Sequence, residues 1–169
     1  LLFFTSSAAF AQQTPRPDSV SEACAASEFR AFDFWVGRWV VRDSTGAQVG
    51  TSHIASVAQG CGLREEWTGG SGSLGTSLNY YDSGEAAWHQ DWVGSNGLIL
   101  HLSGGMRNGA MVMEGTRKGE EGPLRDRIRW RPLDDGRVRQ EWTVSSDGGK
   151  TWERVFLGFY ESASGGGGS

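Results

Sequence analysis

Side chains able to bind a ligand or move a proton gather between residues 74 and 114, in short segments where polar and apolar positions alternate. Three glycine-containing turns, at 82–85, 95–97 and 107–109, read as connections of two or four residues. Even-length connections place odd positions of one strand beside even positions of the next, so they determine which side chains share a face. An odd-length turn at any of the three would reverse the assignment beyond it.

This parity predicts one polar and aromatic face and one mostly apolar face. The polar and aromatic face carries Ser77, Asn79, Tyr81, Trp88, Gln90, Trp92, Ile99, His101, Ser103, Val112 and Glu114. The other face carries Leu74, Leu78, Tyr80, His89, Asp91, Leu98, Leu100, Leu102, Met111 and Met113. Because exposing so many large apolar side chains is costly, we expect both faces to be covered, the outer one by an N-terminal helix or a second subunit.

The polar and aromatic face is our predicted ligand-binding site. If it lines an interior, it forms a pocket with aromatic walls and a few polar groups, as small-molecule cavities do. On two further strands an acid or amide side chain again lies two residues before a tryptophan: Glu65 with Trp67, and Gln140 with Trp142. The predicted binding residues are Asn79, Trp88, Gln90, Trp92, His101, Glu114, Glu65, Trp67, Gln140 and Trp142. Two alternatives remain: an exposed patch for a protein or glycan partner, or cross-strand pairs that only stabilise the sheet.

Acid/base catalysis is the enzymatic alternative. His101 and Glu114 are predicted on the same face of neighbouring strands, and burial can bring the pKa of such groups toward neutrality. No G-x-S-x-G motif supports a nucleophilic serine. The three histidines lie on separate strands without metal-ligand spacing, so we predict neither a metal nor a cofactor.

Charge argues against nucleic acid as a partner. The formal net charge is -4, with both signs interspersed. The one arginine-rich run, 125–131, alternates, which predicts four arginines on a solvated outer face and Asp126, Ile128 and Trp130 on the inner one.

The elements that position these residues are predicted to be about ten short strands separated by glycine-rich turns. They cover 35–42, 49–58, 63–68, 74–81, 86–93, 98–103, 110–118, 126–132, 138–144 and 152–160, and a short helix is expected within 22–32. Short connections imply antiparallel neighbours, and such a meander removes its edges by closing. We therefore predict a single all-β domain over 22–161, an antiparallel up-and-down barrel.

The segments outside this domain predict export. Residues 1–11 are apolar and then small, as in the end of a secretory signal peptide. Residues 12–21 are predicted to be a flexible linker, and 162–169 a Gly/Ser linker or tag. A periplasmic or secreted location would let Cys24 and Cys61 form a disulfide, with two free buried cysteines as the alternative. No apolar run long enough for a membrane-spanning helix occurs after the N-terminus.

Two motifs carry resemblances. Gly37-Arg38-Trp39 is similar to the G-x-W signature of calycins, the group that includes lipocalins and nitrobindin-like barrels. That resemblance implies that Trp39 closes one barrel end, against an arginine of the last strand for which Arg154 is the candidate. Residues 145–152 resemble the Asp-box of propeller proteins, which we interpret as a structural turn. No histidine follows His101, so the haem site of nitrobindin-like barrels is not expected.

A longer set of segments resembles one bacterial family. FDFWVGRW, GTSLNYYD, WHQDWV, GGMRNGAMVMEG and GRVRQEWTVSSDGGKTW together resemble the DUF1579-like family of exported proteins of uncharacterised function. This implies a calycin-like barrel and no particular chemistry. We therefore predict an exported protein that binds a small apolar or amphipathic ligand in the barrel. The alternatives are a lyase- or isomerase-type enzyme in the same cavity and an interaction module, and a homodimer is expected if part of the sheet is covered.

Overall fold

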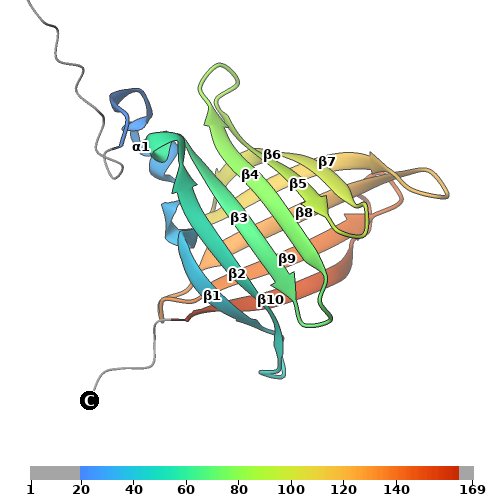
Figure 1. Cartoon of the computed structure of the whole chain (residues 1–169). Coiled ribbons are helices and arrows are strands. Elements are labelled where there is room, and N and C mark those ends of the chain that lie inside the picture. Colours follow the sequence, from blue (N-terminus) through green and yellow to red (C-terminus); the bar gives the residue numbers. More distant parts are fainter. Residues whose placement is uncertain (1–19, 164–169) are drawn as a thin grey trace, which may run out of the picture.

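A computed structural model of the protein describes residues 20–163, which form one closed antiparallel barrel (Figure 1). Each strand pairs with its neighbours in sequence, and the first strand pairs with the last. In chain order the strands are β1 (Gly37–Arg42), β2 (Gln48–Val57), β3 (Gly62–Gly69), β4 (Leu74–Asp82), β5 (Ala87–Gly94), β6 (Ile99–Arg107), β7 (Ala110–Lys118), β8 (Pro123–Pro132), β9 (Val138–Ser145) and β10 (Glu153–Ser162). The predicted all-β barrel of about ten strands is confirmed.

Alternation along each strand separates a mostly apolar interior from a largely charged exterior, as β8 illustrates. Asp126, Ile128 and Trp130 are at most 4% exposed, because they point into the barrel. The intervening arginines point outward, as predicted, and one of them, Arg127, stacks over the ring of Trp152 at 3.8 Å. Burying one residue in two supplies the hydrophobic stabilisation of a sheet that water touches on its outer side.

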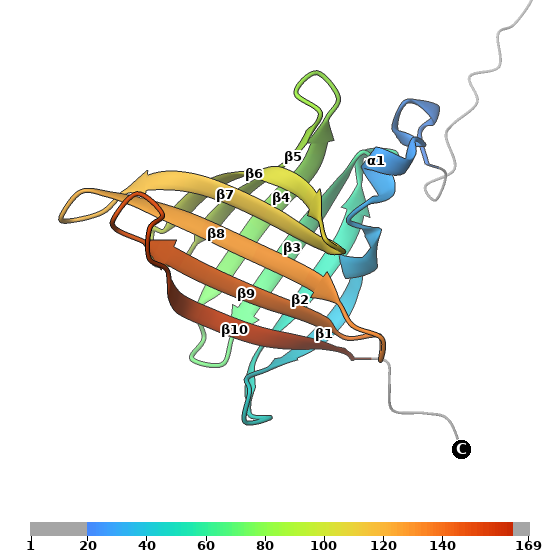
Figure 2. The ribbon, with the colours of Figure 1, turned by 180° about the vertical axis from the view of Figure 1, so that it is seen from behind.

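The segment before β1 covers one end of the barrel (Figure 2). In place of the single helix predicted within 22–32, it contains three short pieces, η1 (Glu22–Cys24), α1 (Ser27–Arg30) and η2 (Asp33–Trp35). Among the contacts that hold this segment in place, a disulfide joins Cys24 to Cys61, Arg30 donates to the carbonyl of Gly60, and the Trp88 indole donates to the carbonyl of Glu28 at 2.9 Å. The predicted disulfide is confirmed.

Aromatic side chains fill the covered end of the barrel, which we call the closed end. Phe32 is fully buried and its ring lies 5.0 Å from Trp35, 5.2 Å from Trp130 and 5.6 Å from Trp88, centroid to centroid. Trp35 in turn contacts Tyr160 on β10 at 6.1 Å. The N-terminal segment thus contributes the centre of the core at this end.

Trp39 also lies at the closed end, but its partner is not Arg154. The Trp39 indole donates to the carbonyl of Trp35 at 2.9 Å, and its ring packs against Tyr160. A Cβ at Gly37 would lie 3.2 Å from the same ring. Arg154 lies at the opposite end of β10, is half exposed and pairs with Glu141 at 3.9 Å. The expectation for Arg154 was wrong because it came from a resemblance and not from the register, which pairs Trp39 with Ser162.

The remaining terminal predictions fall mostly outside the described residues. The signal remnant at 1–11, residues 12–19 of the linker predicted at 12–21 and residues 164–169 of the tail predicted at 162–169 all lie there. The end of the predicted linker is part of the fold, since the backbone N–H of Ser21 donates to the carbonyl of Gln59 at 2.7 Å. The domain itself ends later than predicted, because β10 includes Ser162. Within residues 20–163 no helix has the length and apolar character needed to cross a membrane. The Asp-box resemblance is structural, since the Asp147 carboxylate accepts hydrogen bonds from the backbone of Lys150 and Thr151 at 2.9 Å each.

Candidate functional site

The strand register determines which predicted site residues face the interior. Across β4 and β5, Ser77 pairs with Trp92, Asn79 with Gln90, and Tyr81 with Trp88, as the parity argument predicted. Across β5 and β6, however, Gln90 pairs with Leu102 and Trp92 with Leu100. The connection between these strands has three residues, 95–97, between Gly94 and Leu98, whose backbones are hydrogen-bonded. An odd-length turn reverses the faces, so the leucines of β6 are inside and His101 is outside.

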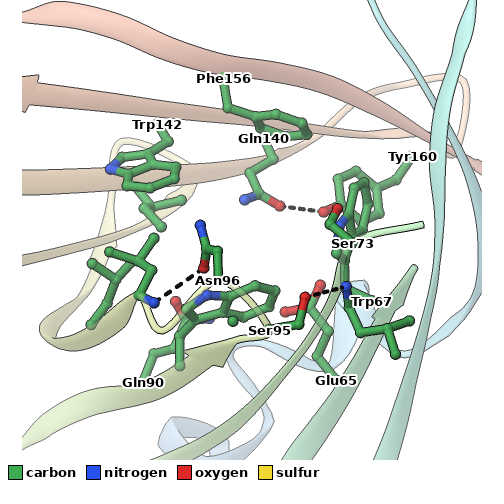
Figure 3. Close-up of a pocket in the computed structure, with 16 residues that line it drawn as sticks. Glu65, Trp67, Ser73, Gln90, Ser95, Asn96, Gln140, Trp142, Phe156 and Tyr160 are labelled. Carbon is green, nitrogen blue, oxygen red and sulfur yellow. Dashed lines mark hydrogen bonds between the residues drawn. The ribbon is translucent and has the colours of Figure 1, made fainter. Parts of the chain in front are cut away.

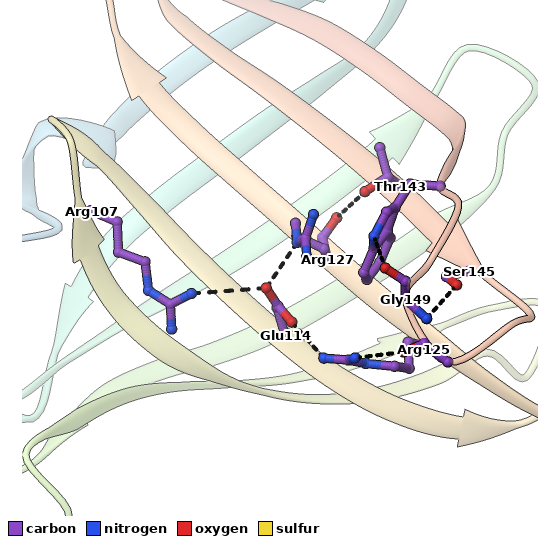
Figure 4. A network of polar contacts seen from close by, with 9 residues as sticks. Arg107, Glu114, Arg125, Arg127, Thr143, Ser145 and Gly149 are labelled. Carbon is purple, nitrogen blue, oxygen red and sulfur yellow. Dashed lines mark hydrogen bonds and ion pairs between the residues drawn. The ribbon is translucent and has the colours of Figure 1, made fainter.

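His101 and Glu114 are therefore corrections to the predicted site. The imidazole of His101 is 75% exposed, and its Nδ1 lies 2.6 Å from Oδ1 of Asp91 on the outer surface. Glu114 lies on the outside of β7, where its carboxylate accepts from Arg125 at 2.9 Å and Arg127 at 2.8 Å (Figure 4). Neither residue reaches the interior, so the acid/base pair predicted from the sequence does not form.

A cavity of about 200 Å³ lies inside the barrel at the end opposite the aromatic cluster (Figure 3). Its rim includes the hairpins that join β3 to β4 and β5 to β6, and these hairpins are linked by hydrogen bonds between Leu74 and Ser95. Sixteen residues line it: Glu65, Trp67, Ser73, Leu74, Gln90, Trp92, Gly94, Ser95, Asn96, Leu98, Leu100, Ile128, Gln140, Trp142, Phe156 and Tyr160. We call this the open-end cavity.

Its walls are aromatic rings that lie against glycines of neighbouring strands. A Cβ at Gly75 would come within 2.2 Å of the Trp92 ring, and one at Gly50 within 2.5 Å of the Trp67 ring. A side chain at either position would displace the ring, so only glycine lets each indole rest on the barrel wall. On the other side Trp142 is held by its indole nitrogen, which donates to Asp126 at 2.8 Å.

Two polar residues of the cavity, Glu65 and Gln90, belong to one connected network of hydrogen bonds. The Glu65 carboxylate is 4% exposed and accepts from the hydroxyls of Ser52 at 2.9 Å and Ser77 at 3.1 Å. Ser77 accepts from the Asn79 amide at 2.9 Å, and Asn79 accepts from the Gln90 amide at 2.8 Å. Four strands, β2 to β5, thus contribute to holding one acid inside the barrel.

Burial decides the protonation of this acid. Desolvation raises the pKa of Glu65 to about 7, and the hydrogen bonds from Ser52 and Ser77 offset part of that rise. Tyr160 faces the same space and bonds to the amide oxygen of Gln140. Burial and the nearby Glu65 charge raise the pKa of Tyr160 well above its ordinary value, so its hydroxyl stays neutral.

The raised pKa predicts a specific dependence of stability on pH. As pH rises from 4.5 to about 7, unfolded chains release the Glu65 proton while the folded protein retains it, so stability falls. Glu65→Gln removes this penalty. At acidic pH we expect the variant and the unmodified protein to have nearly the same free energy of unfolding. Above neutral pH the variant should be more stable by about 3 kcal/mol, as measured by urea unfolding at several pH values. Glu66→Gln, next in sequence and pointing outward, is the control; a pH-independent difference for Glu65→Gln would contradict the assignment.

Six of the ten predicted binding residues line the open-end cavity: Glu65, Trp67, Gln90, Trp92, Gln140 and Trp142. Asn79 lies beneath them in the Glu65 network, and Trp88 belongs to the closed end. The sequence analysis missed Phe156 and Tyr160, which alternate on the inner face of β10, and Ser52, which pairs with Trp67 across β2 and β3. Following the alternation from Trp142 across the last hairpin, or from Trp67 to the preceding strand, would have found them.

One group of possible metal ligands lies elsewhere. The ligand atoms of Asp82, Glu85 and His89 all lie within 4.8 Å of one another beside the β4–β5 turn. The Asp82 carboxylate already accepts from the turn backbone, at 2.7 Å from Gly84, which is the ordinary role of an aspartate there. We therefore interpret Asp82 as a residue that stabilises the turn and not as a metal ligand.

The class of protein that these features define is a closed ten-stranded antiparallel barrel with a ligand-sized cavity at one end. No protein-family model matches the sequence, and no curated protein matches it significantly.

Proposed function

We propose that the protein binds a small, partly apolar ligand in the open-end cavity. The observation that carries this proposal is the composition of the cavity: three tryptophans and a phenylalanine form its walls, and a buried carboxyl and two glutamines supply its polar contacts. This is the usual make-up of a small-molecule site. A volume of about 200 Å³ lies below the roughly 300–1,000 Å³ of sites for larger ligands, which favours a small molecule or one group of a longer one.

Three further expectations belong to this proposal. Export to the periplasm or the exterior is supported by the disulfide, which persists in oxidising compartments. Membership of the calycin-like barrels, and of the DUF1579-like family within them, is supported by the barrel and by the place of Trp39 at its closed end.

A fragment screen followed by NMR tests the binding proposal. We expect bound fragments to shift the indole N–H signals of Trp67, Trp92 and Trp142 while leaving the fully buried Trp35 unchanged. Trp92→Ala should weaken the best fragment at least about tenfold, because it removes one aromatic wall. Trp152→Ala, which removes an indole from the outer surface, is the matched control. Fragments that shift only outer indoles, or none that bind, would contradict the proposal.

One buried group, Glu65, supports acid/base catalysis as the alternative function. Glu65 is buried, faces the cavity and has a pKa near neutrality, which suits proton transfer at physiological pH. The enzymatic alternative therefore moves from His101 and Glu114 to Glu65. It requires turnover of a bound compound that Glu65→Gln abolishes while binding persists.

The alternative of a protein-interaction module requires a different surface from the one predicted, because Trp88 and Trp92 face inward. The outer apolar side chains of this region are Leu78, Val93 and Ile99, each about half exposed on neighbouring strands. If the protein forms the expected homodimer, this patch is the surface that a second copy would cover.

A further inference from the structure

We propose that the molecule bound in the open-end cavity is an organic cation, whose ammonium group pairs with Glu65 between the aromatic walls. This inference rests on the proposed binding function and names its ligand class. Three features of the cavity support it: the charge of its lining, the hydrogen bonds that Glu65 accepts and the aromatic rings of its walls.

The first feature is a buried acid without a counter-ion. Among the cavity-lining residues, all within the described part of the chain, none is basic, and Glu65 and Tyr160 are the titratable ones. Arg117, on the inner face of β7, is already paired at 2.9 Å with Asp126, the residue that holds Trp142. Buried charges in proteins are paired, so a ligand that supplies the positive charge completes the site.

The second feature is the direction of the hydrogen bonds around Glu65. The Ser77 hydroxyl accepts from Asn79 and donates to one oxygen of Glu65, and the Ser52 hydroxyl donates to the other. Both oxygens of Glu65 are thus placed as acceptors. This arrangement favours the ionised form as soon as a positive charge offsets its desolvation.

The third feature is the way the tryptophans meet the cavity. Trp67 lies against Gly50 and Trp92 lies against Gly75, so each indole packs on the barrel wall and both line the cavity. Phe156 meets the Trp67 ring at 89° and 6.0 Å, while Trp142 and Phe156 project from the side opposite Glu65 and Gln90 (Figure 3). Faces of aromatic rings carry negative charge density and attract ammonium groups, which an apolar lining of leucine would not do.

The test compares a cation with its uncharged isostere. The probes are choline and 3,3-dimethylbutan-1-ol, which differ by the replacement of the charged nitrogen with carbon. We expect choline to bind at least about tenfold more tightly at pH 8 by isothermal titration calorimetry. Glu65→Gln, checked for folding by circular dichroism, should bring the two affinities within about threefold. Glu66→Gln removes the same charge from the outer face of β3 and should leave the preference intact.

Proton linkage gives a second readout. Glu65 must be ionised to pair with choline, and the other groups that face it, Ser52, Ser77 and Tyr160, hold no charge between pH 6 and 8. With the pKa of Glu65 about 7, choline affinity should fall about tenfold from pH 8 to pH 6, while the affinity for the alcohol stays constant.

The outcomes separate this inference from the function on which it rests. Equal binding of choline and the alcohol, or unchanged choline binding by Glu65→Gln, would overturn the cation assignment and leave cavity binding standing. The same holds if the fragment screen yields only neutral or anionic ligands. Absence of any ligand for the cavity would overturn both proposals.

Discussion

Phe32→Ala is expected to destabilise the protein by about 3–5 kcal/mol, the range for removing a fully buried phenylalanine. Its ring is stacked on Trp35 at 15° between planes and has edge contacts with Trp88 and Trp130. These partners come from η2, β5 and β8, so no single rearrangement can fill the space that the ring leaves. Urea unfolding monitored by tryptophan fluorescence measures the loss.

Val36→Ala is the matched control for Phe32→Ala. Val36 lies four residues further on but is 40% exposed, so its truncation should change stability by less than about 1 kcal/mol. A loss below about 1 kcal/mol for Phe32→Ala itself would show that the N-terminal segment does not pack into the closed end.

Removing the disulfide is expected to have an effect of similar size. Cys24 and Cys61 are 37 residues apart, and closing a loop of that length stabilises a protein by about 4 kcal/mol on the chain-entropy account. The cross-link ties η1 to the turn between β2 and β3, so its loss also frees the segment that carries Phe32. The double variant Cys24→Ser/Cys61→Ser should therefore melt roughly 10 °C lower in a thermal scan.

Reductant provides the control for that experiment. Dithiothreitol should lower the melting temperature of the unmodified protein to that of the double variant, and should leave the variant unchanged. An unmodified protein whose melting temperature is insensitive to full reduction would contradict the stabilising role of the cross-link.

The sequence was sufficient to predict the strands because alternation and glycine-rich turns are local signals. Each of the ten predicted runs overlaps one observed strand, and the run at 110–118 coincides with β7. Pairing across the β4–β5 turn was also predictable, since its even length left the parity intact. Together these features correctly predict that Gln90 and Trp92 share a face with Asn79 and Ser77.

The face of β6 could not be predicted from its turn alone. Ser95-Asn96-Gly97 suits a two-residue connection as well as a three-residue one with Gly97 at positive φ, and the structure has the latter, with φ of 82°. Because of that one additional turn residue, Leu100 and Leu102 point into the barrel, and His101 and Ser103 point outward. The hydrophobicity of the side chains would have predicted the correct face, because burying two leucines is favoured over burying a histidine and a serine.

The role of Glu65 was hidden for a different reason. Its partners Ser52 and Ser77 are more than ten residues away in sequence, and the pairing of β3 with β2 and β4 brings them to its two oxygens. Likewise, Gly50 and Gly75 lie within predicted strands, and the requirement for glycine there follows only from the rings of Trp67 and Trp92 that lie against them.

A crystal structure of the protein with its tightest-binding fragment tests the central claim most directly. We predict density for the fragment inside the open-end cavity, in contact with Trp92 and Trp142 and within hydrogen-bonding distance of Glu65 or Gln90. Density at the outer surface near Leu78 and Ile99, with the cavity filled by its own side chains, would contradict the account and favour an interaction module.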